Sequence, residues 1–300
     1  MTTLGFVGTG TIGAPMAGRL LAAGHVLRVL DSNPAACTAL VDAGAAVATS
    51  PADLAVDCAT VFLSLPGPAV IEAVMLGDDG LLARPGALTT VVDLSTNALD
   101  LNRRLAEQAA SRGVAYLDAP VSGGKAAAAA GKLAVMVGGE DAAFARIRPL
   151  LECFAAHVFH LGPAGAGTLA KLVNNQIFLA ASVLVQEGFV LGAKAGMDAN
   201  VLREVLAVSS AGPYLARADL VLSHRYDRDI FALGIAAKDI GLALESAAAL
   251  GAELPLTAAA QGVYARALEL GDAREDFHAT LRALEDAAQT TVARLQSKPR

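Results

Sequence analysis

The sequence predicts an α/β fold in which an N-terminal, doubly wound parallel sheet is joined by a long helix to a C-terminal, all-helical domain. Three observations predict it. Short apolar segments typical of buried strands alternate with helical segments through the first half of the chain. The alternation stops at Gly162-Pro163, and a proline-free apolar segment from Gly165 to about Gly196 then reads as one long helix. We therefore expect domains at residues 1–163 and 164–300.

The composition limits the classes of protein that fit. The chain has 300 residues, of which 54% are hydrophobic and 17% charged, so it can bury a sizeable core. The net charge of −6 and the lack of a basic cluster argue against a nucleic-acid partner. Three scattered cysteines and no basic N-terminal leader favour a reducing, cytoplasmic location. We expect no membrane span, because the long helix carries Lys171, Gln186 and Glu187.

The first strand and the loop after it form the most specific motif. Residues 4–7 are apolar and run into a G-x-G-x-x-G sequence, which a helical pattern and a second strand at 26–30 follow. In such a loop the first glycine permits the tight turn, the second lets the backbone approach a pyrophosphate, and the third lets the helix pack closely. This order indicates a Rossmann dinucleotide-binding domain. The predicted cofactor-binding residues are Gly8, Gly10, Thr11, Ile12 and Gly13.

Asp31, at the end of the second predicted strand, is the residue expected to select the cofactor. A carboxylate there accepts hydrogen bonds from ribose hydroxyls and repels a 2′-phosphate. No lysine or arginine occurs between Arg28 and Arg84, so nothing nearby in the sequence neutralises that phosphate. The sequence therefore predicts NAD rather than NADP. The alternative is that Asp31 is a turn residue before Asn33-Pro34.

The remaining strand-like segments lie at 61–65, 90–94, 114–118, 134–137 and 157–161 and extend the predicted parallel sheet. Ligands bind outside the carboxyl ends of such strands. The residues expected there are Leu65, Pro66, Ser95, Thr96 and the loop 120–124. For Thr96 the alternative is capping of the next helix.

The loop 119–125 carries a hydroxyl at Ser122 and two small residues, Gly123 and Gly124. Consecutive N–H groups without side-chain hindrance form concavities that bind anions, including carboxylates. We therefore expect this loop to bind an acidic substrate. A simple glycine turn is an equally good interpretation of these three residues alone.

The long helix carries polar residues on one face. Lys171, Asn174, Asn175 and Phe178 have the spacing i, i+3, i+4 and i+7. A lysine and two amides are costly to bury without partners, so this face is expected to line a cleft. Our hypothesis is that Lys171 transfers a proton, and the alternative is a lysine that extends out to solvent. Thr168 is the candidate cap of this helix.

Further helices are expected at about 198–208, 213–223, 231–250, 255–270 and 275–295. Lys238-Asp239 is a charged pair in a mostly apolar segment, and its alternative is an ordinary surface pair. Gly188 and Gly192 leave room for close helix packing, which hints at a subunit interface. No cluster has metal-ligand spacing, so we expect no metal.

Four motifs, in this order along the chain, resemble those of the β-hydroxyacid dehydrogenases, the family of 3-hydroxyisobutyrate dehydrogenase and tartronate semialdehyde reductase. They are the segments 5–17, 118–124 and 165–175 and the pair Lys238-Asp239. The resemblance implies an NAD-dependent oxidoreductase that moves a hydride between the nicotinamide and a small 3-hydroxy acid or semialdehyde acid. It also implies a homodimer or homotetramer built by the helical domain.

The resemblance also implies roles for single residues. Lys171 is expected to be the catalytic acid/base, and Asn175 to hold the substrate or the lysine. Ser95, Thr96 and Phe231 are expected near the nicotinamide, as is Lys238, which also contacts substrate. The expected substrate-binding residues are Ser122, Gly123, Gly124, Asn174, Lys238 and Asp239. Lys125 stands where many relatives have a small or apolar residue, which leaves substrate preference open.

Two rival functions remain at this point. An imine reductase-like enzyme that uses NADPH shares the fold, but Lys171 and Asp31 argue against it. A non-catalytic NAD-binding scaffold protein is the second rival. Relatives of that kind lack the lysine, whereas here Lys171, Asn175 and Ser122 are all present.

Overall fold

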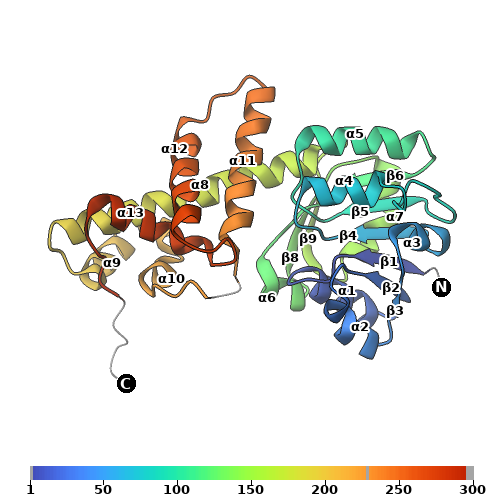
Figure 1. Ribbon diagram of the computed structural model, residues 1–300, viewed down its shortest axis with the longest axis horizontal. Helices are drawn as coiled ribbons and strands as arrows, with labels where there is room; N and C mark the ends of the chain where they lie inside the picture. The colour runs from blue at the N-terminus through green and yellow to red at the C-terminus, as the bar shows by residue number, and fades with distance from the viewer. Residues whose placement is uncertain (1–2, 228–229, 295–300) are drawn as a thin grey trace. The chain divides into compact units, whose positions relative to one another are not determined.

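The computed structural model describes residues 3–227 and 230–294 (Figure 1). Internal contacts divide the chain into two compact units, Met1–Leu172 and Val173–Arg300. This division falls inside one helix, α8 (Ala166–Lys194), nine residues after the predicted domain boundary at 163/164. The first two turns of α8 therefore pack with the N-terminal unit. The two units are described separately below.

A parallel sheet with strand order β3-β2-β1-β4-β5-β6 forms the centre of the first unit. Every strand that the sequence predicts up to residue 118 belongs to this sheet, and the short strand β3 was not predicted. The strand bounds are β1 Leu4–Val7, β2 Leu27–Leu30, β3 Ala46–Val47, β4 Thr60–Leu63, β5 Thr90–Asp93 and β6 Ala115–Asp118.

Helices cover both faces of the sheet, as the doubly wound prediction requires. One apolar core joins the sheet to α1, α6 and α7, and a second joins its other face to α3, α4 and α5. Figure 1 shows α4 and α5 lying along one side of the strands. The helix bounds are α1 Gly13–Ala22, α2 Thr38–Asp42, α3 Pro51–Asp57, α4 Pro68–Leu76, α5 Leu99–Ala110, α6 Gly124–Ala129 and α7 Asp141–Leu151, with a 3-10 turn, η1, at Pro34–Cys37.

The last strands of the first unit do not extend the parallel sheet, and here the prediction is wrong. β8 (Leu133–Val137) and β9 (Ala155–His160) form a separate three-stranded sheet with β7 (Val121–Ser122). β7 and β8 are antiparallel, whereas β8 and β9 are parallel. The connection from β7 to β8 contains only the short helix α6, which does not form a crossover to the edge of the first sheet.

The start of α8 depends on a residue far away in the sequence. Thr168, the predicted cap, lies inside the helix. The cap is instead the Asp118 carboxylate, which accepts hydrogen bonds from the N–H groups of Gly165 and Thr168, both at 2.7 Å. A Cβ at Gly167 would lie 2.1 Å from the Met136 carbonyl oxygen, so only glycine allows this turn to approach β8 so closely.

The second unit is entirely helical. Its predicted helices are present, but 213–223 is a 3-10 turn followed by a short helix. The helix predicted over 275–295 is a 3-10 turn and a helix that ends at Ala288, and residue 295 lies outside the described residues. Gly192 packs against Leu202 of the same chain, since a Cβ there would lie 2.4 Å from that side chain, whereas Gly188 faces open space. The bounds are α9 Ala199–Ala207, η2 Gly212–Leu215, α10 Ala218–Leu222, α11 Leu233–Ala249, α12 Pro255–Leu270, η3 Phe277–Ala279 and α13 Thr280–Ala288.

Within the described part of the chain, α8 is the helix long and apolar enough to cross a membrane, judged by length and composition alone. Lys171, Gln186 and Glu187, on which the expectation of no membrane span rested, therefore do not keep this helix below the limit of that test. Within its apolar window, 33% of α8 is buried inside the protein. It buries the polar side chains of Thr168, Asn175 and Gln186 and packs into both apolar clusters of the second unit. The side of α8 that carries these buried residues therefore packs against protein rather than lipid.

Candidate functional site

The glycine loop between β1 and α1 has the geometry that its sequence motif requires. Gly8 has a φ of +89°, and a Cβ there would lie 2.2 Å from the Ser64 carbonyl oxygen. A Cβ at Gly13 would lie 1.9 Å from the Gly8 carbonyl oxygen. These two glycines are therefore needed by the fold itself. At Gly10, in contrast, a Cβ would meet no protein atom within 4 Å, so this position keeps space for a ligand.

The residues of this loop fit a dinucleotide. Ile12 at the N-cap of α1 makes no side-chain cap hydrogen bond, and the first turn of the helix contains no acidic residue. The Ala14 N–H donates to the Gly10 carbonyl oxygen at 3.0 Å and Pro15 has no N–H, so the N–H groups of Ile12 and Gly13 are those that phosphate oxygens could use, and the helix dipole also favours such binding. Open space over Gly10 and an uncapped helix start are the two features that a bound pyrophosphate needs.

Asp31 is held in a fixed orientation at the carboxyl end of β2. Its Oδ2 accepts the Thr9 N–H at 2.7 Å, and its Oδ1 accepts the Asn33 N–H at 2.8 Å. The turn interpretation is therefore correct, because Asp31 does hold the turn before Pro34, and its contact with the ribose stays a prediction. The two roles are compatible, since a carboxylate oxygen has more than one lone pair for hydrogen bonds.

Arg28 is the basic residue nearest to Asp31 in the sequence, and its side chain is engaged elsewhere. Its guanidinium lies 2.8 Å from Asp53 and 2.5 Å from Asp57, both on α3. Backbone and side-chain hydrogen bonds from Thr49 and the Arg28 charge lower the pKa of Asp53 and keep that carboxyl ionised. Arg28 is thus held by two acidic residues on α3.

The ends of β4 and β5 are joined by a side-chain contact. The Leu65 N–H donates to Ser95 Oγ at 2.9 Å, and the Ser95 N–H donates to Asp93 Oδ1 at 3.0 Å. Ser95 is buried. The helix after this loop starts without a side-chain cap from Thr96, because the N-cap residue of α5 is Ala98. The structure therefore brings Leu65, Pro66 and Ser95 together at neighbouring strand ends.

The loop predicted to bind a carboxylate runs from β7 into α6. Ser122 pairs with Ala134 of β8, which fixes the position of the loop on the second sheet. Gly123 and Gly124 have φ values of +134° and +73°, a region that L side chains rarely adopt. Both glycines are exposed, so their N–H groups lie at the surface of the first unit.

Lys171 lies in the second turn of α8, at the end of the first unit. It follows Thr168, whose side chain is fully buried and whose N–H is held by Asp118. Lys171 itself is half-buried. The position of its backbone is therefore set by a capped, buried helix start rather than by a loop.

In the second unit, the predicted polar residues of α8 and α11 meet. The Asn175 side-chain N–H donates to Asp239 Oδ2 at 2.6 Å, although 64 residues separate the two. The Lys238 ammonium lies 3.0 Å from Asp239 Oδ1, and Asn174 donates to Asn175 Oδ1 at 2.9 Å. Asn175 is 3% exposed and Asp239 1%. Asp239 therefore orients both Asn175 and Lys238, and the pair Lys238-Asp239 is not an ordinary surface pair.

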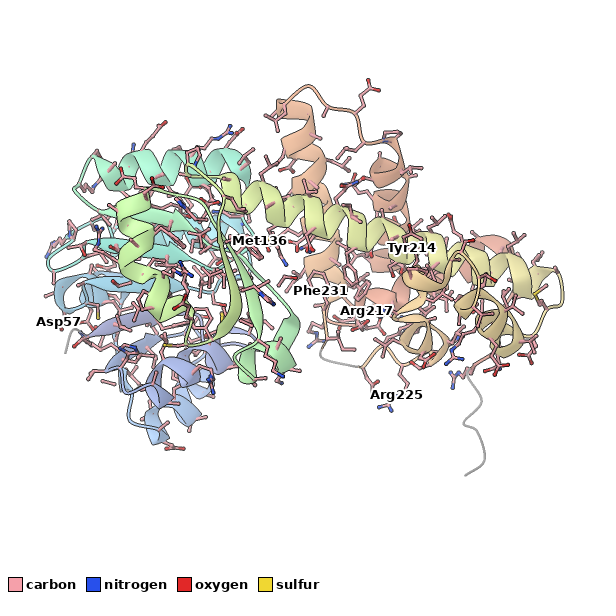
Figure 2. The ribbon with its side chains drawn as sticks, turned by 180° about the vertical axis from the view of Figure 1, so that it is seen from behind. Asp57, Met136, Tyr214, Arg217, Arg225 and Phe231 are labelled. Carbon is pink, nitrogen blue, oxygen red and sulfur yellow. The ribbon has the colours of Figure 1, made fainter. Side chains whose placement is uncertain are left out.

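Phe231 packs at the edge of the apolar core of the second unit. Its ring centroid lies 5.8 Å from that of Phe277, which in turn lies 5.2 Å from Phe178 of α8. The Arg217 guanidinium sits 4.9 Å over the Phe178 ring. Figure 2 labels Phe231 and Arg217 within this unit. Phe231 precedes α11, so the predicted helix starts two residues too early.

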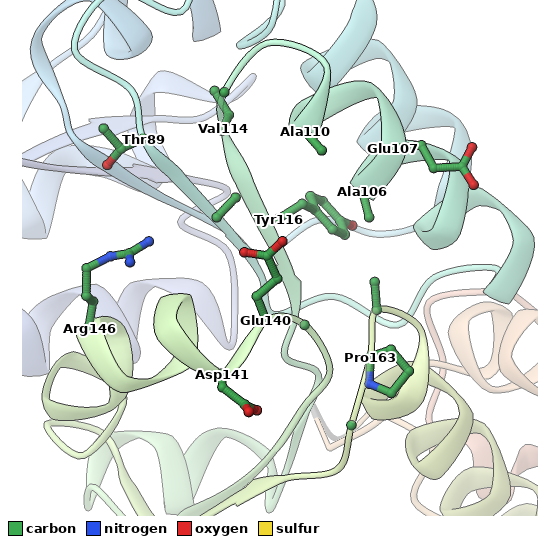
Figure 3. A pocket seen from close by; sticks show the side chains of 15 residues that line it. Thr89, Ala106, Glu107, Ala110, Val114, Tyr116, Glu140, Asp141, Arg146 and Pro163 are labelled. Atoms are coloured by element: carbon green, nitrogen blue, oxygen red, sulfur yellow. The ribbon is translucent and has the colours of Figure 1, made fainter.

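A large cavity of the first unit is not the predicted site. It measures about 1230 Å³ and lies along β6 between α5 and α7. Figure 3 shows Glu107, Glu140 and Arg146 lining it. None of the predicted site residues lines this cavity, and its residues Thr89 and Val114 precede the amino ends of their strands. Ligands of this fold bind at the opposite ends of the strands.

No group of three or more His, Cys, Asp or Glu side chains in residues 3–227 and 230–294 could hold a metal ion. The residues that could hold a cofactor are those of the glycine loop and Asp31. A fixed carboxylate and an uncapped helix start provide for the ribose hydroxyls and the phosphates of a dinucleotide, respectively.

Sequence reasoning missed the buried polar residues beneath the strand ends. Burial raises the pKa of the Asp93 carboxyl to about 6 and also raises the pKa of Asp118. Burial likewise raises the pKa of Tyr116 well above its ordinary value. An acidic residue at the end of a buried strand, as in Thr90–Asp93 and Ala115–Asp118, was the signal that could have identified the two carboxyls.

Two family models together cover nearly the whole chain. Residues 3–162 match the NAD binding domain of 6-phosphogluconate dehydrogenase. Residues 165–284 match the NAD-binding domain of NADP-dependent 3-hydroxyisobutyrate dehydrogenase. The chain therefore consists of NAD-binding domains, and NAD is its cofactor.

Relatives of known activity match over similar lengths. The chain is 39% identical to the NAD-dependent L-serine dehydrogenase of Pseudomonas aeruginosa, covering 92% of this chain and 96% of that protein. It is 40% identical to the 3-hydroxyisobutyrate dehydrogenase of the same organism, covering 88% and 91%. The structure of Mycobacterium tuberculosis 3-hydroxyisobutyrate dehydrogenase with L-serine superposes with a TM-score of 0.83 at 34% identity, covering 95% and 99%. The chain belongs to the β-hydroxyacid dehydrogenase family and is an oxidoreductase of that class.

Proposed function

We propose that this protein is an NAD-dependent dehydrogenase that transfers a hydride between the nicotinamide and a small 3-hydroxy acid or its semialdehyde, with Lys171 as the general acid/base. The observation that carries the proposal is the placement of Lys171. It lies one turn after a buried, capped helix start in the same unit as the glycine loop and Asp31.

The preference for NAD over NADP rests on two contacts. Asp31 presents a carboxylate that two backbone N–H groups hold in place, where a 2′-phosphate would meet its negative charge. Arg28, the nearby residue that could neutralise that phosphate, is paired with Asp53 and Asp57. A change to NADP would therefore require both a new cation and the loss of Asp31.

The chemistry asked of Lys171 is proton transfer at the substrate oxygen. Bound NAD supplies the hydride acceptor, and in the reverse direction NADH supplies the donor. In reduction the Lys171 ammonium polarises the carbonyl and donates its proton to the oxygen as the alcohol forms. In oxidation the neutral amine accepts the hydroxyl proton. A lysine amine is mostly protonated at neutral pH, so oxidation should be fastest in alkaline solution.

The substrate class follows from the relatives and from the carboxylate loop. Serine and 3-hydroxyisobutyrate, named in the relatives' activities, share a hydroxymethyl group on the carbon next to the carboxylate. In our proposal the N–H groups of Gly123 and Gly124 and the Ser122 hydroxyl bind that carboxylate. The proposed substrate-binding residues of the second unit are Asn174, Asn175, Lys238 and Asp239, and Phe231 stays a predicted cofactor neighbour.

The test is an NADH-formation assay at alkaline pH with 3-hydroxyisobutyrate, glycerate and serine, each with NAD⁺ and with NADP⁺. We expect turnover with at least one of these acids and a clear preference for NAD⁺. 4-Hydroxybutyrate is the matched control, because its hydroxyl is one carbon farther from the carboxylate. Turnover of no 3-hydroxy acid, or equal rates with NADP⁺, contradicts the proposal. Reduction of cyclic imines with NADPH favours the rival enzyme class.

We also propose that the protein forms a homodimer or homotetramer through α8. Ile177, Leu184 and Leu191 follow one another at seven-residue spacing and are 60%, 67% and 73% exposed. Such a row of large apolar side chains on one helix face is typical of an interface. Light scattering after chromatography should show an oligomer for the wild type and a smaller species for Leu184→Glu. A wild-type monomer contradicts this proposal.

A reducing compartment such as the cytoplasm is proposed from the thiols. Cys37, Cys58 and Cys153 are all free, and burial raises the pKa of the Cys58 thiol to about 11. A thiol held protonated in this way is a poor nucleophile for disulfide formation.

A further inference from the structure

A continuous chain of buried side chains runs beneath the strand ends of the first unit. It contains Asp93 at the end of β5, Asn97 and Asn102 near and in α5, Tyr116 on β6 and Thr168 on α8. Their exposed fractions are 5% for Tyr116 and 0% for the other four. Polar groups so deeply buried are expected to satisfy one another's hydrogen bonds.

The orientation of the two amides follows from the backbone. The Ala98 N–H donates to Asn97 Oδ1 at 2.8 Å, so the Asn97 side-chain nitrogen must be the atom that faces Asn102, at 2.6 Å. The atom of Asn102 that receives this hydrogen bond is therefore its oxygen. The Asn102 side-chain nitrogen then donates to Thr168 Oγ1. The Ala98 N–H thus fixes the donor and the acceptor in each of these hydrogen bonds.

If Asp93 is ionised, there is one hydrogen too few for the two hydrogen bonds that the Tyr116 oxygen makes. The Tyr116 oxygen lies 2.6 Å from Asn102 Oδ1 and 2.9 Å from Asp93 Oδ2. An amide oxygen and a carboxylate only accept hydrogen bonds, and a tyrosine hydroxyl has one hydrogen. The Asn97 side-chain nitrogen also donates to Asp93 Oδ2, at 3.4 Å, but its hydrogens lie in neither of the two Tyr116 contacts, so the second hydrogen of those contacts must come from Asp93. As a neutral acid, Asp93 donates to Tyr116, and Tyr116 then donates to Asn102.

The surroundings of Asp93 favour its neutral form. The carboxyl is fully buried, and the negative charge of Asp118 on the neighbouring strand acts on it. The Ser95 N–H, which donates to Asp93 Oδ1, is compatible with either form, because the carbonyl oxygen of an acid also accepts. Burial, the largest cause, and Asp118 raise the pKa of this carboxyl to about 6, while hydrogen bonds from Ser95 and Tyr116 lower it, so the neutral acid predominates below about pH 6.

This chain of hydrogen-bonded side chains joins two parts of the proposed active site. At one end Asp93 holds Ser95, whose hydroxyl accepts the Leu65 N–H at the end of β4. At the other end Asn102 holds Thr168, which lies three residues before Lys171 on α8. A residue one turn from Lys171 is therefore tied, through buried side chains alone, to the loop at the strand ends.

We propose that Tyr116 and Asn102 are positioning residues for Lys171, acting through a hydrogen-bond chain that is complete only when Asp93 is a neutral acid. This inference rests on the proposed role of Lys171. The hydrogen-bond chain fixes the first turn of α8 relative to the β5–α5 loop. When it is broken, Lys171 is misplaced, which slows hydride transfer without weakening cofactor binding.

The test compares Tyr116→Phe with Tyr264→Phe in the full-length protein. Tyr264 is also fully buried, and its hydroxyl donates to the Leu179 carbonyl oxygen of α8, so both variants lose one buried hydroxyl. The first readout is hydrogen exchange of the amides at 165–171 at about pH 5, below the pKa of about 6 of Asp93, and it does not depend on activity. The second is kcat for reduction of the semialdehyde at the same pH, with KM and the Kd of NADH measured beside it.

We expect Tyr116→Phe to speed exchange at 165–171 and to lower kcat by about tenfold, with the NADH Kd unchanged. Tyr264→Phe should change neither readout to that extent. Asp93→Asn should stay close to wild type in both, because its side-chain nitrogen can donate to Tyr116 while its oxygen accepts from Ser95. Asp93→Leu, which can do neither, should behave like Tyr116→Phe.

The proposal is overturned if Tyr116→Phe matches Tyr264→Phe in either readout, or if Asp93→Asn is as impaired as Asp93→Leu. These results remain distinct from a failure of the proposed function. If Lys171 is not the acid/base, a Lys171 variant keeps its turnover. The exchange readout still reports on the hydrogen-bond chain in that case.

Discussion

Two carboxylates of the first unit and one of the second, Asp239, are held by different means. In the first unit backbone N–H groups orient the carboxylates: Thr9 and Asn33 hold Asp31, and Gly165 and Thr168 hold Asp118. In the second unit side chains hold one another, as Asn174, Asn175 and Lys238 gather around Asp239. A site built on backbone geometry is sensitive to steric changes. A site built on side chains is sensitive to the loss of charge.

This difference affects what a mutation can change. A carboxylate that accepts backbone N–H groups keeps its position as long as the strand ends stay in place. Asp239 has no such support from the backbone in the contacts described here, so removing it leaves its neighbours to rearrange. We therefore expect variants of the first unit to change ligand binding and catalysis, and variants around Asp239 to change stability first.

The largest effect is expected for Lys171→Met. Loss of a general acid/base should lower turnover by about 10²–10⁴-fold. The matched control is Lys194→Met on the same helix, where the ammonium donates to the Ala288 carbonyl oxygen. Steady-state kinetics and NADH binding should be measured for both variants. A Lys171→Met enzyme that binds NADH and keeps near-normal turnover would reject the catalytic role and leave the first unit as a binding unit only.

The second prediction concerns the pH dependence of stability. The pKa of Asp93 is raised from 3.8 to about 6 in the folded protein, so the folded state keeps a proton that the unfolded chain releases. Its contribution to stability is complete below about pH 4 and is lost as pH rises toward about 6, by about 3 kcal/mol.

Urea denaturation across this range should show a steeper fall for the wild type than for Asp93→Asn, which cannot titrate. Asp118 is present in both proteins and its pKa is raised in both, so the difference between the two curves reports Asp93 together with its coupling to Asp118. Parallel curves would show that Asp93 has the same pKa in the folded and unfolded states.

The third prediction addresses the second unit. Asp239→Ala removes the acceptor of the Asn175 hydrogen bond and the partner of Lys238 and should lower the free energy of unfolding by about 2 kcal/mol. Asp286→Ala is the control, since its side chain is half exposed and pairs with Arg266 at the surface. The control should unfold like the wild type. If both variants lose the same stability, the buried group around Asp239 is no stronger than a surface ion pair.

The smallest effect should come from Gly10→Ala. A Cβ there meets no protein atom, so the fold should tolerate it, but it occupies the space expected for the pyrophosphate. We expect the Kd of NADH to rise by about tenfold, equal to 1.4 kcal/mol, without loss of thermal stability. Gly18→Ala is the control, since Gly18 lies in the interior of α1 and a Cβ there would be 3.9 Å from the Leu40 side chain. It should stabilise the helix and leave NADH binding unchanged. Unchanged NADH binding by Gly10→Ala would place the pyrophosphate elsewhere.

The parts of the fold that could be predicted are those that local physics determines. Strand and helix alternation identified β1, β2, β4, β5 and β6, because buried parallel strands are short apolar runs between helices. The glycine loop was predicted residue by residue, since the steric need at Gly8 and Gly13 lies within the motif itself. The separate sheet of β7, β8 and β9 was missed, because an apolar run carries no information on which strand it will pair with.

By itself the sequence determined the cofactor loop, the carboxylate at Asp31 and the polar face of α8, because glycine conformations and helical spacing act over a few residues. Only the tertiary structure decided that Asp118 rather than Thr168 caps α8, that α3 holds Arg28, and that Asp239 orients Asn175. Each of these contacts joins residues 25 to 64 positions apart. Burial creates the need for such partners, and the packing of the chain selects which residues supply them.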